Sequence, residues 1–583
     1  MKEKKTFTID YKRIVYTLSM LALCAVAFVR AVGGGDWWNA AISCVGFCLF
    51  PVIVIRFGFK SFLKIPYLIW LLISSPAAYF IIKKYYYSAI HRMAFALLVV
   101  ECVVYGLILI RIIFGLFKKE FKDFFIYKTP LFYIVGLFFV LSTVSINKAI
   151  WPIFFGVYFI AFFMAPADKE DDEKLFVSLC DSLILAFFLI QSFAFLHRPY
   201  DQARYVGAYT NANVNAMFYY CVYLGMLGKY SFLRKHNAKK GILIPHFLFA
   251  SVIWSFALLT ISRGTLVSFV LTTIIYLIIS ECIIVKKNFW KGFLLNGVLM
   301  FLAFAVSFPL AFICVRYIPP LRHHPIWITE YSEDFVHSYD PWNSEKYIEI
   351  DEFIDELLGR MKAENFPEED SSDEESYEEE SKTTIFVLLK RYASSLEQAD
   401  EEESNDELEY IVLDDGMVIQ YPDGVMPGAD EWHPAYSDYR EETFWERIVR
   451  SRPYIYKYFL RNLTWEGHEV EYPLIYIFYW KTIPHAHNSY LQIAYSFGII
   501  PGILYLIISL TGLIIPIVYI FVKKDKAPWY FAFITCAQFG IILMGLTENL
   551  AMPGKMLFSL VFLCLLPITY INQKKSEHKN MDN

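Results

Sequence analysis

The chain has 583 residues, of which 56% are hydrophobic and 18% aromatic, and its mean hydropathy is +0.40. This composition excludes an ordinary soluble globular protein and indicates many membrane spans, each needing about 20 apolar residues. The net charge of −5 combines two opposed parts, because residues 316–484 carry −25 and the rest of the chain +20. No nucleic-acid partner is expected.

The apolar segments predict an all-α polytopic membrane protein with about 14 transmembrane helices. The first segment follows a basic N-terminus and could be a cleaved signal peptide, but its length favours a helix that is kept. The expected spans are residues 14–32, 38–57, 65–82, 94–116, 130–146, 149–167, 174–196, 212–228, 241–261, 264–285, 293–315, 501–522, 528–547 and 556–572.

Basic residues between these spans predict the orientation, because Lys and Arg concentrate on the cytoplasmic side. With a cytoplasmic N-terminus, the inner segments carry 28 basic residues and the short outer loops carry nine. We therefore expect both termini in the cytoplasm and the longest loop outside; only the loop 83–92 argues against this orientation.

Residues 316–484 form one long polar insertion between an N-terminal membrane region, 1–315, and a C-terminal one, 485–583. The insertion holds 40 acidic and 15 basic residues. Its two acidic runs are typical of a solvated linker, and calcium binding or repulsion of anionic glycan is the alternative. An Asp-Gly turn within 410–421 predicts a hairpin, and residues 439–462 have helical spacing that restarts at Pro453. We expect a mixed α/β extracytoplasmic region.

Several polar groups fall at the outer ends of the expected spans. Arg204 and Asn213 precede one span, Arg263 lies between two, and Glu548 follows another. A buried Arg in a membrane is costly, so Arg263 either has a function or reaches the surface from a short turn. A guanidinium offers a planar fork to phosphate oxygens, so Arg204 and Arg263 are candidate pyrophosphate ligands.

The segment 484–492 joins the insertion to the next membrane region and contains His485, His487 and Asn488. A His-x-His pair could bind zinc, but no third ligand is evident and no cysteine spacing fits a metal. A general base is the better interpretation, with His487 preferred over His485. Asn488 could orient the imidazole or bind a sugar hydroxyl. We expect no metal and no cofactor.

Three motifs in this order resemble the O-antigen ligase and O-antigen polymerase family of bacterial envelope glycosyltransferases. They are Arg204-x-x-Gly207 followed by Asn-Ala-Asn at 211–213, Ser-Arg-Gly at 262–264, and His-Ala-His-Asn-x-x-Leu-Gln at 485–492 with Gly498 and Pro-Gly at 501–502. The resemblance covers about residues 200–505. The long acidic insertion departs from the family's usual pattern and leaves the acceptor open.

The resemblance implies a GT-C-like enzyme of the inner membrane that moves a glycan from undecaprenyl pyrophosphate to an acceptor hydroxyl. It implies that Arg204 and Arg263 hold the pyrophosphate and that His487, or else His485, activates the acceptor. Asn213, Asn488 and Glu548, which the expected orientation places on the same side of the membrane, are further candidate substrate-binding residues. Polymerase, ligase and protein O-oligosaccharyltransferase remain alternatives. A polysaccharide flippase or transporter is the alternative from another class.

Overall fold

The computed structural model describes residues 10–32, 44–89, 91–118, 130–147, 149, 151–165, 169–197, 200, 204–209, 211–280, 289–319, 321, 349–359, 410–412, 418–420, 452–469, 475–478, 481–483 and 485–547. The chain divides into two compact units. The helical unit comprises Met1–Glu349, Ile455–Glu471 and His485–Asn583, and the second unit comprises Ile350–Tyr454 and Tyr472–Pro484.

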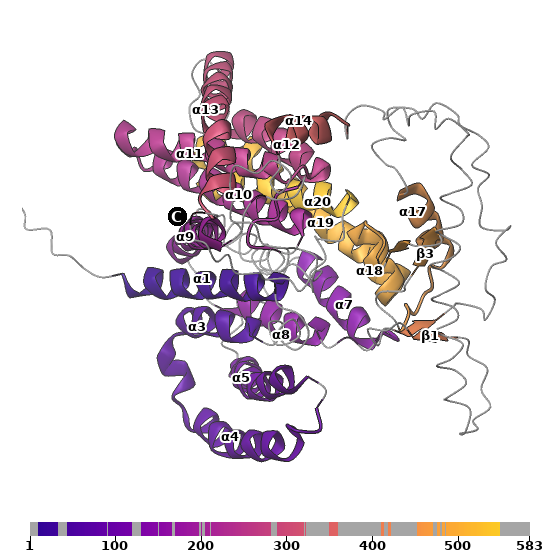
Figure 1. Cartoon of the computed structure of the whole chain (residues 1–583). Helices are drawn as coiled ribbons and strands as arrows, with labels where there is room; N and C mark the ends of the chain where they lie inside the picture. The colour runs from indigo at the N-terminus through magenta and orange to yellow at the C-terminus, as the bar shows by residue number, and fades with distance from the viewer. Residues whose placement is uncertain are drawn as a thin grey trace, which may run out of the picture. The chain divides into compact units, whose positions relative to one another are not determined.

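The helical unit is built from long apolar helices with short connections (Figure 1). In chain order they are α1 (Tyr11–Val32), α3 (Val45–Phe57), η1 (Phe59–Phe62), α4 (Ile65–Tyr85), α5 (Arg92–Phe117), α7 (Pro130–Val144), α8 (Trp151–Met164), α9 (Lys169–His197), α10 (Ala212–Lys235), α11 (Lys240–Leu259), α12 (Arg263–Ser280), α13 (Phe289–Tyr317), α18 (Ser489–Phe497), α19 (Ile499–Lys523), η4 (Lys524–Lys526) and α20 (Trp529–Thr547).

Nine helices in the described part of the chain are long and apolar enough to cross a membrane. Three shorter apolar helices lie at 45–57, 133–144 and 151–162. The protein is thus an α-helical polytopic membrane protein, as its composition predicts. Over their described residues, the expected spans up to 547 coincide with helices. Residues 38–43, 281–285 and 556–572 lie outside the described residues, so the count of fourteen spans stays a prediction.

Helix α10 is the central helix of this unit and packs against α9, α11, α12 and α20. Its side chains are buried on all sides from Asn215 to Gly228. Because neighbouring helices surround it, α10 can carry hydroxyls that would be costly in lipid. The hydroxyl of Tyr220 is hydrogen-bonded to that of Thr272 of α12 at 2.7 Å, and the hydroxyl of Tyr223 to that of Thr273 at 2.5 Å.

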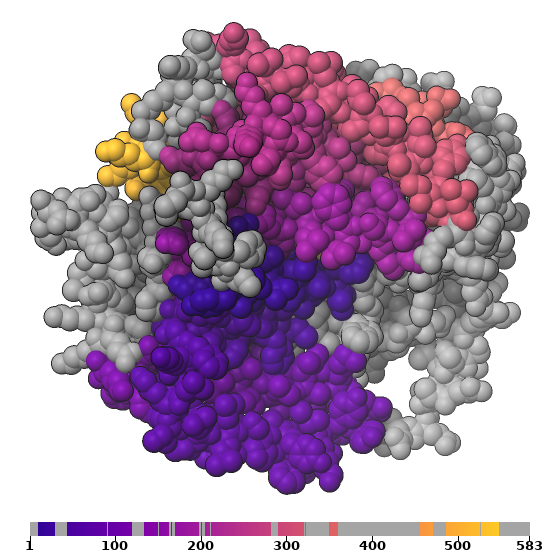
Figure 2. Space-filling view, turned by 90° about the vertical axis from the view of Figure 1, so that its left-hand side faces the viewer, coloured from indigo at the N-terminus to yellow at the C-terminus, as the bar shows by residue number. Residues whose placement is uncertain are grey.

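Helix α1 joins the N-terminal helices to the rest of the unit, because it packs against both α3 and α9. In Figure 2 the indigo surface of α1 lies between the purple N-terminal helices and the magenta helices that follow α9. Helices α4 and α5 pair at the edge, where the indole nitrogen of Trp70 donates to the carbonyl of Val103 at 2.9 Å.

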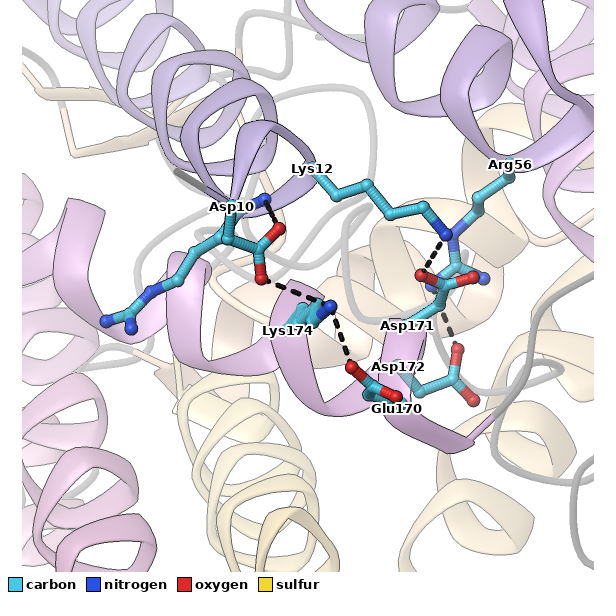
Figure 3. A network of polar contacts seen from close by, with 8 residues as sticks. Asp10, Lys12, Arg56, Glu170, Asp171, Asp172 and Lys174 are labelled. Atoms are coloured by element: carbon cyan, nitrogen blue, oxygen red, sulfur yellow. Dashed lines mark hydrogen bonds and ion pairs between the residues drawn. The ribbon is translucent and has the colours of Figure 1, made fainter. Parts of the chain in front are cut away.

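A network of charged side chains ties α1, α3 and α9 together at one end of the helices (Figure 3). It centres on the acidic first turn of α9, where negative charge also suits the helix dipole. The ion pairs are Lys12–Asp171 at 2.7 Å, Arg56–Asp172 at 2.9 Å, Lys174–Asp10 at 3.1 Å and Lys174–Glu170 at 2.8 Å.

The second unit contains α14 (Ile350–Gly359) and two antiparallel strand pairs. Strands β1 (Tyr410–Val412) and β2 (Val418–Gln420) pair with Ile411 opposite Ile419, at the position of the expected hairpin. Strands β3 (Ile475–Phe478) and β4 (Lys481–Ile483) pair with a register shift between Tyr476 and Phe478. The acidic runs at 368–380 and 400–409 lie outside the described residues.

Helix α17 (Arg452–Arg461) begins one residue before Pro453, as the restart of helical spacing predicts. From Ile455 onward its residues belong to the helical unit. Phe459 is fully buried, and its ring packs edge-on against Tyr495 of α18 at 4.9 Å. The segment 455–471 of the expected insertion is thus part of the support for α18.

Candidate active site

The Arg204 loop and the turn between α11 and α12 are joined by hydrogen bonds. The Nε of Arg204 donates to the carbonyl of Thr260 at 3.0 Å, and the backbone N–H of Tyr205 donates to Leu259 at 2.9 Å. An Nη of Arg204 also donates to the Oδ1 of Asn213 at 2.5 Å. The structure therefore brings together the first two sequence motifs, with Arg204 held in a fixed direction.

The start of α10 explains the Asn-rich part of the first motif. Asn211 caps the helix by accepting the backbone N–H of Asn213 at 2.8 Å. Gly207 has a φ of +59°, and a Cβ there would lie 2.9 Å from the side-chain nitrogen of buried Asn215. The loop thus needs glycine at 207 both for its conformation and for space.

Arg263 is the first residue of α12 and is half-buried. The turn before it is tight, because Ile261 adopts a φ of +47°. The hydroxyls of Ser262 and Thr265 are 3.0 Å apart at the start of the helix. Arg263 therefore lies in the turn that joins α11 to α12 and not deep within a helix.

The His485 and His487 rings lie against each other, with centroids 4.2 Å apart and planes at 67°. Both histidines are half-buried, and His487 adopts a φ of +46°. The hydroxyl of Tyr456 in α17 donates to the carbonyl of His487 at 3.3 Å and to that of Leu546 at 2.9 Å. Helix α17 and the end of α20 thus hold the backbone of His487.

Asn488 caps α18. Its Oδ1 accepts the backbone N–H groups of Tyr490 at 3.0 Å and Leu491 at 3.1 Å. Its Nδ2 donates to the carbonyl of Leu546 at 3.3 Å. These contacts make Asn488 a positioning residue for the histidine loop, and its expected contact with a sugar hydroxyl stays a prediction.

Two supporting residues were not among the predicted site residues. Gln492 is fully buried; its Oε1 accepts the backbone N–H of Ala486 at 2.9 Å, and its Nε2 donates to Ser496 at 3.2 Å. This bridge fixes the residue between the two histidines. Gln492 belongs to the third motif and could have been singled out from it, whereas Tyr456 lies in the insertion without any local signal.

The directions of the helices place the Arg and His loops on the same face of the helical unit. Contacts pair Tyr220 with Thr272 and then Leu227 with Tyr276, so α12 runs parallel to α10. Tyr220 also meets the carbonyl of Cys536, and Phe232 packs against Trp529 at 5.5 Å, so α20 is antiparallel to α10. The beginnings of α10 and α12 therefore share one face with the end of α20.

The three loops also lie at similar heights on this face. From the junction of Tyr220, Thr272 and Cys536, nine residues lead back to Asn211 and nine to Arg263, and ten lead forward to Leu546. At 1.5 Å per residue these distances are about 14–15 Å along each helix. The three loops therefore lie on one face of the helical unit, at similar distances from this junction.

The charged network of Figure 3, which belongs to α1, α3 and α9, lies near the other ends of α10 and α20, because α9 also pairs with both of those ends. Lys229, near the end of α10, pairs with Asp181 of α9 at 2.6 Å, and the indole of Trp529 donates to Glu173 at 3.2 Å. The Arg and His loops are thus separated from this network by the length of the helices.

Glu548, the remaining predicted site residue, lies outside the described residues. Within the described ranges, no group of three or more His, Cys, Asp or Glu side chains is arranged to hold a metal ion. No protein-family model, curated protein or solved structure matches the chain.

Proposed function

We propose that this protein transfers a glycan from undecaprenyl pyrophosphate to an acceptor hydroxyl at the outer face of the bacterial inner membrane, as an O-antigen or surface-polysaccharide polymerase or ligase. The observation that supports this most is the common face and height of the Arg204 loop, the Arg263 turn and the His485–Asn488 loop. A lipid-linked substrate would present its pyrophosphate and its sugar together at one such face, at the membrane surface.

In this proposal Arg204 and Arg263 bind the donor pyrophosphate. Arg204 is already oriented by Thr260 and Asn213, so its charge needs little reorganisation when the leaving group forms. A guanidinium stays charged at all working pH values, which suits stabilisation of a departing pyrophosphate.

His487 is the proposed general base, with His485 as the second candidate. The acceptor hydroxyl loses its proton to the imidazole as its oxygen bonds to the anomeric carbon with inversion. The bond from that carbon to the phosphate oxygen breaks, and undecaprenyl pyrophosphate leaves. Such a base contributes about 10²–10⁴ in rate.

The proposed topology has fourteen spans, both termini in the cytoplasm and an acidic α/β insertion at 316–484 outside. It is supported by the preference of Lys and Arg for the cytoplasmic side and by the charged network at the ends remote from the His loop. An acidic insertion on the same side of the membrane as the site would favour acceptors of low negative charge.

The test is the surface-glycan profile of a deletion strain complemented with wild type or with His487→Ala or Arg263→Ala. Both variants should fail to restore the glycan while reaching the membrane at normal levels. The neighbouring residues His91 and Arg92, on the same predicted side, provide the matched controls His91→Ala and Arg92→Ala, which should restore it.

The deletion phenotype separates the alternatives. Acceptors that carry a single repeat indicate a polymerase, whereas bare acceptors with long glycan on the lipid carrier indicate a ligase. Full complementation by either site variant would reject the proposed site and favour a transporter.

A further inference from the structure

Glu101 is a carboxylic acid within a membrane-spanning helix. Its side chain is 2% exposed, and it lies nine residues after the first residue of α5, which has 26 residues. At 1.5 Å per residue this is about 14 Å along the helix, near the middle of a hydrocarbon layer of about 30 Å. Ionisable residues at that depth are costly and mark proton or ion sites.

The partners of Glu101 are two neutral donors. Its Oε1 accepts the backbone N–H of Gly46 at 2.7 Å and the hydroxyl of Tyr158 at 3.4 Å. Gly46 is the second residue of α3, whose preceding residue, Cys44, makes no side-chain cap. Glu101 therefore supplies the acceptor that the first turn of α3 lacks.

No cation balances this carboxyl in the part of the chain that the structure describes. The other elements packed against α5 are α4, which contributes the neutral Trp70, and η1, which carries Lys60 and follows the end of α3 remote from Gly46. The titratable groups nearest to Glu101 are all neutral when protonated: Cys44 and Cys48 of α3, Cys102 and Tyr105 of α5, and Tyr158 of α8. An ionised carboxylate here would be buried without a counter-charge, which is far more costly than a neutral acid.

We propose that Glu101 is a proton-binding site inside the membrane, at the junction of α3, α5 and α8. Both hydrogen bonds fall on Oε1, which is the acceptor oxygen of a neutral carboxylic acid, so the proton belongs on Oε2. Release of this proton places a full negative charge against the first turn of α3. Proton uptake and release are thereby linked to the contact between these helices.

This site is independent of the proposed glycan transfer. Arg204, Arg263 and His487 lie on or beside α10, α12 and α18, whereas Glu101 contacts only α3 and α8 through its hydrogen bonds. The two proposals can therefore fail separately.

Infrared spectroscopy of the full-length protein in lipid nanodiscs tests the proposal. At pH 7 exposed carboxyls are ionised, so a carbonyl stretch of a protonated acid should be present in wild type and absent from Glu101→Gln. The control Glu170→Gln removes a carboxyl whose side chain is 75% exposed, and it should leave the band unchanged. A wild-type spectrum without the band, or a band that survives in Glu101→Gln, overturns the proposal.

A second measurement on wild type covers the case in which Glu101→Gln does not fold. Dicyclohexylcarbodiimide is apolar and modifies protonated carboxyls, so peptide mass spectrometry should find an adduct on Glu101 that declines as the pH is raised. If Glu101 reacts only after the protein is denatured, or equally at every pH, it is an ionised or inaccessible helix cap and the proposal fails.

Discussion

The ion pair between Arg56 and Asp172 gives the sharpest prediction about stability. Both side chains are 0% exposed, and they meet at 2.9 Å between the end of α3 and the first turn of α9. Within the described residues, the Nε and Nη1 of Arg56 have no hydrogen-bond partner. Asp172→Asn therefore leaves a buried guanidinium without its counter-charge, which should lower the free energy of unfolding by about 3–5 kcal/mol.

The control for this prediction is the neighbouring pair Lys12–Asp171, whose side chains are 31% and 12% exposed. Solvent screens that pair, so Asp171→Asn should cost about 1 kcal/mol or less. The double variant Arg56→Met, Asp172→Leu removes both charges and should recover most of the loss, because apolar replacements of a buried pair are often neutral.

Thermal unfolding of the purified, detergent-solubilised variants measures these effects. Asp172→Asn should unfold several degrees below wild type, and the double variant should unfold closer to wild type. The reasoning is refuted if Asp172→Asn and Asp171→Asn have equal Tm values, or if the double variant is as unstable as the single one.

Two further predictions concern the site and its support. Tyr456→Phe removes the hydroxyl that donates to the carbonyls of His487 and Leu546. If this hydrogen bond contributes about 1 kcal/mol to positioning the histidine loop for reaction, its loss should slow glycan transfer about fivefold. Tyr458→Phe on the same helix should leave the rate unchanged. Equal kcat values for the two variants would contradict this role. Gly540→Val places a side chain where a Cβ would lie 1.6 Å from the Tyr220 hydroxyl, so it should lower the Tm by separating α10 from α20. The ring carbon Cζ of Tyr220 would lie 2.2 Å from that Cβ, so adding Tyr220→Phe should not restore the Tm. A Gly540→Val variant with the Tm of wild type would contradict the packing.

The membrane helices can be predicted from the sequence because each long apolar run determines the length of its own helix without reference to distant residues. The same holds for the start of α17 at Pro453 and for the hairpin of β1 and β2, where the signals are short-range. The central position of α10 could not be predicted, because its tyrosines and asparagines make it less apolar than its neighbours. Burial among four helices explains that composition only after the fold is known.

The motif residues were recognisable, but their contacts were not. Arg204 donates a hydrogen bond to the carbonyl of Thr260, 56 residues further along the chain, and Tyr456 donates one to the carbonyl of Leu546, 90 residues further along. No local pattern encodes such pairings. The positive φ of His487 likewise has no signal in the local sequence. Glu101 was hidden within an apolar run, and only its neighbours Gly46 and Tyr158 distinguish it.

The most direct test of the glycan-transfer proposal is release of undecaprenyl pyrophosphate by purified protein in liposomes that contain undecaprenyl-pyrophosphate-linked glycan. Wild type and His91→Ala should release it at equal rates as the glycan is transferred, and His487→Ala should be at least about 10²-fold slower. Release by His487→Ala at the wild-type rate, or no release by wild type with any acceptor glycan supplied, would contradict the account.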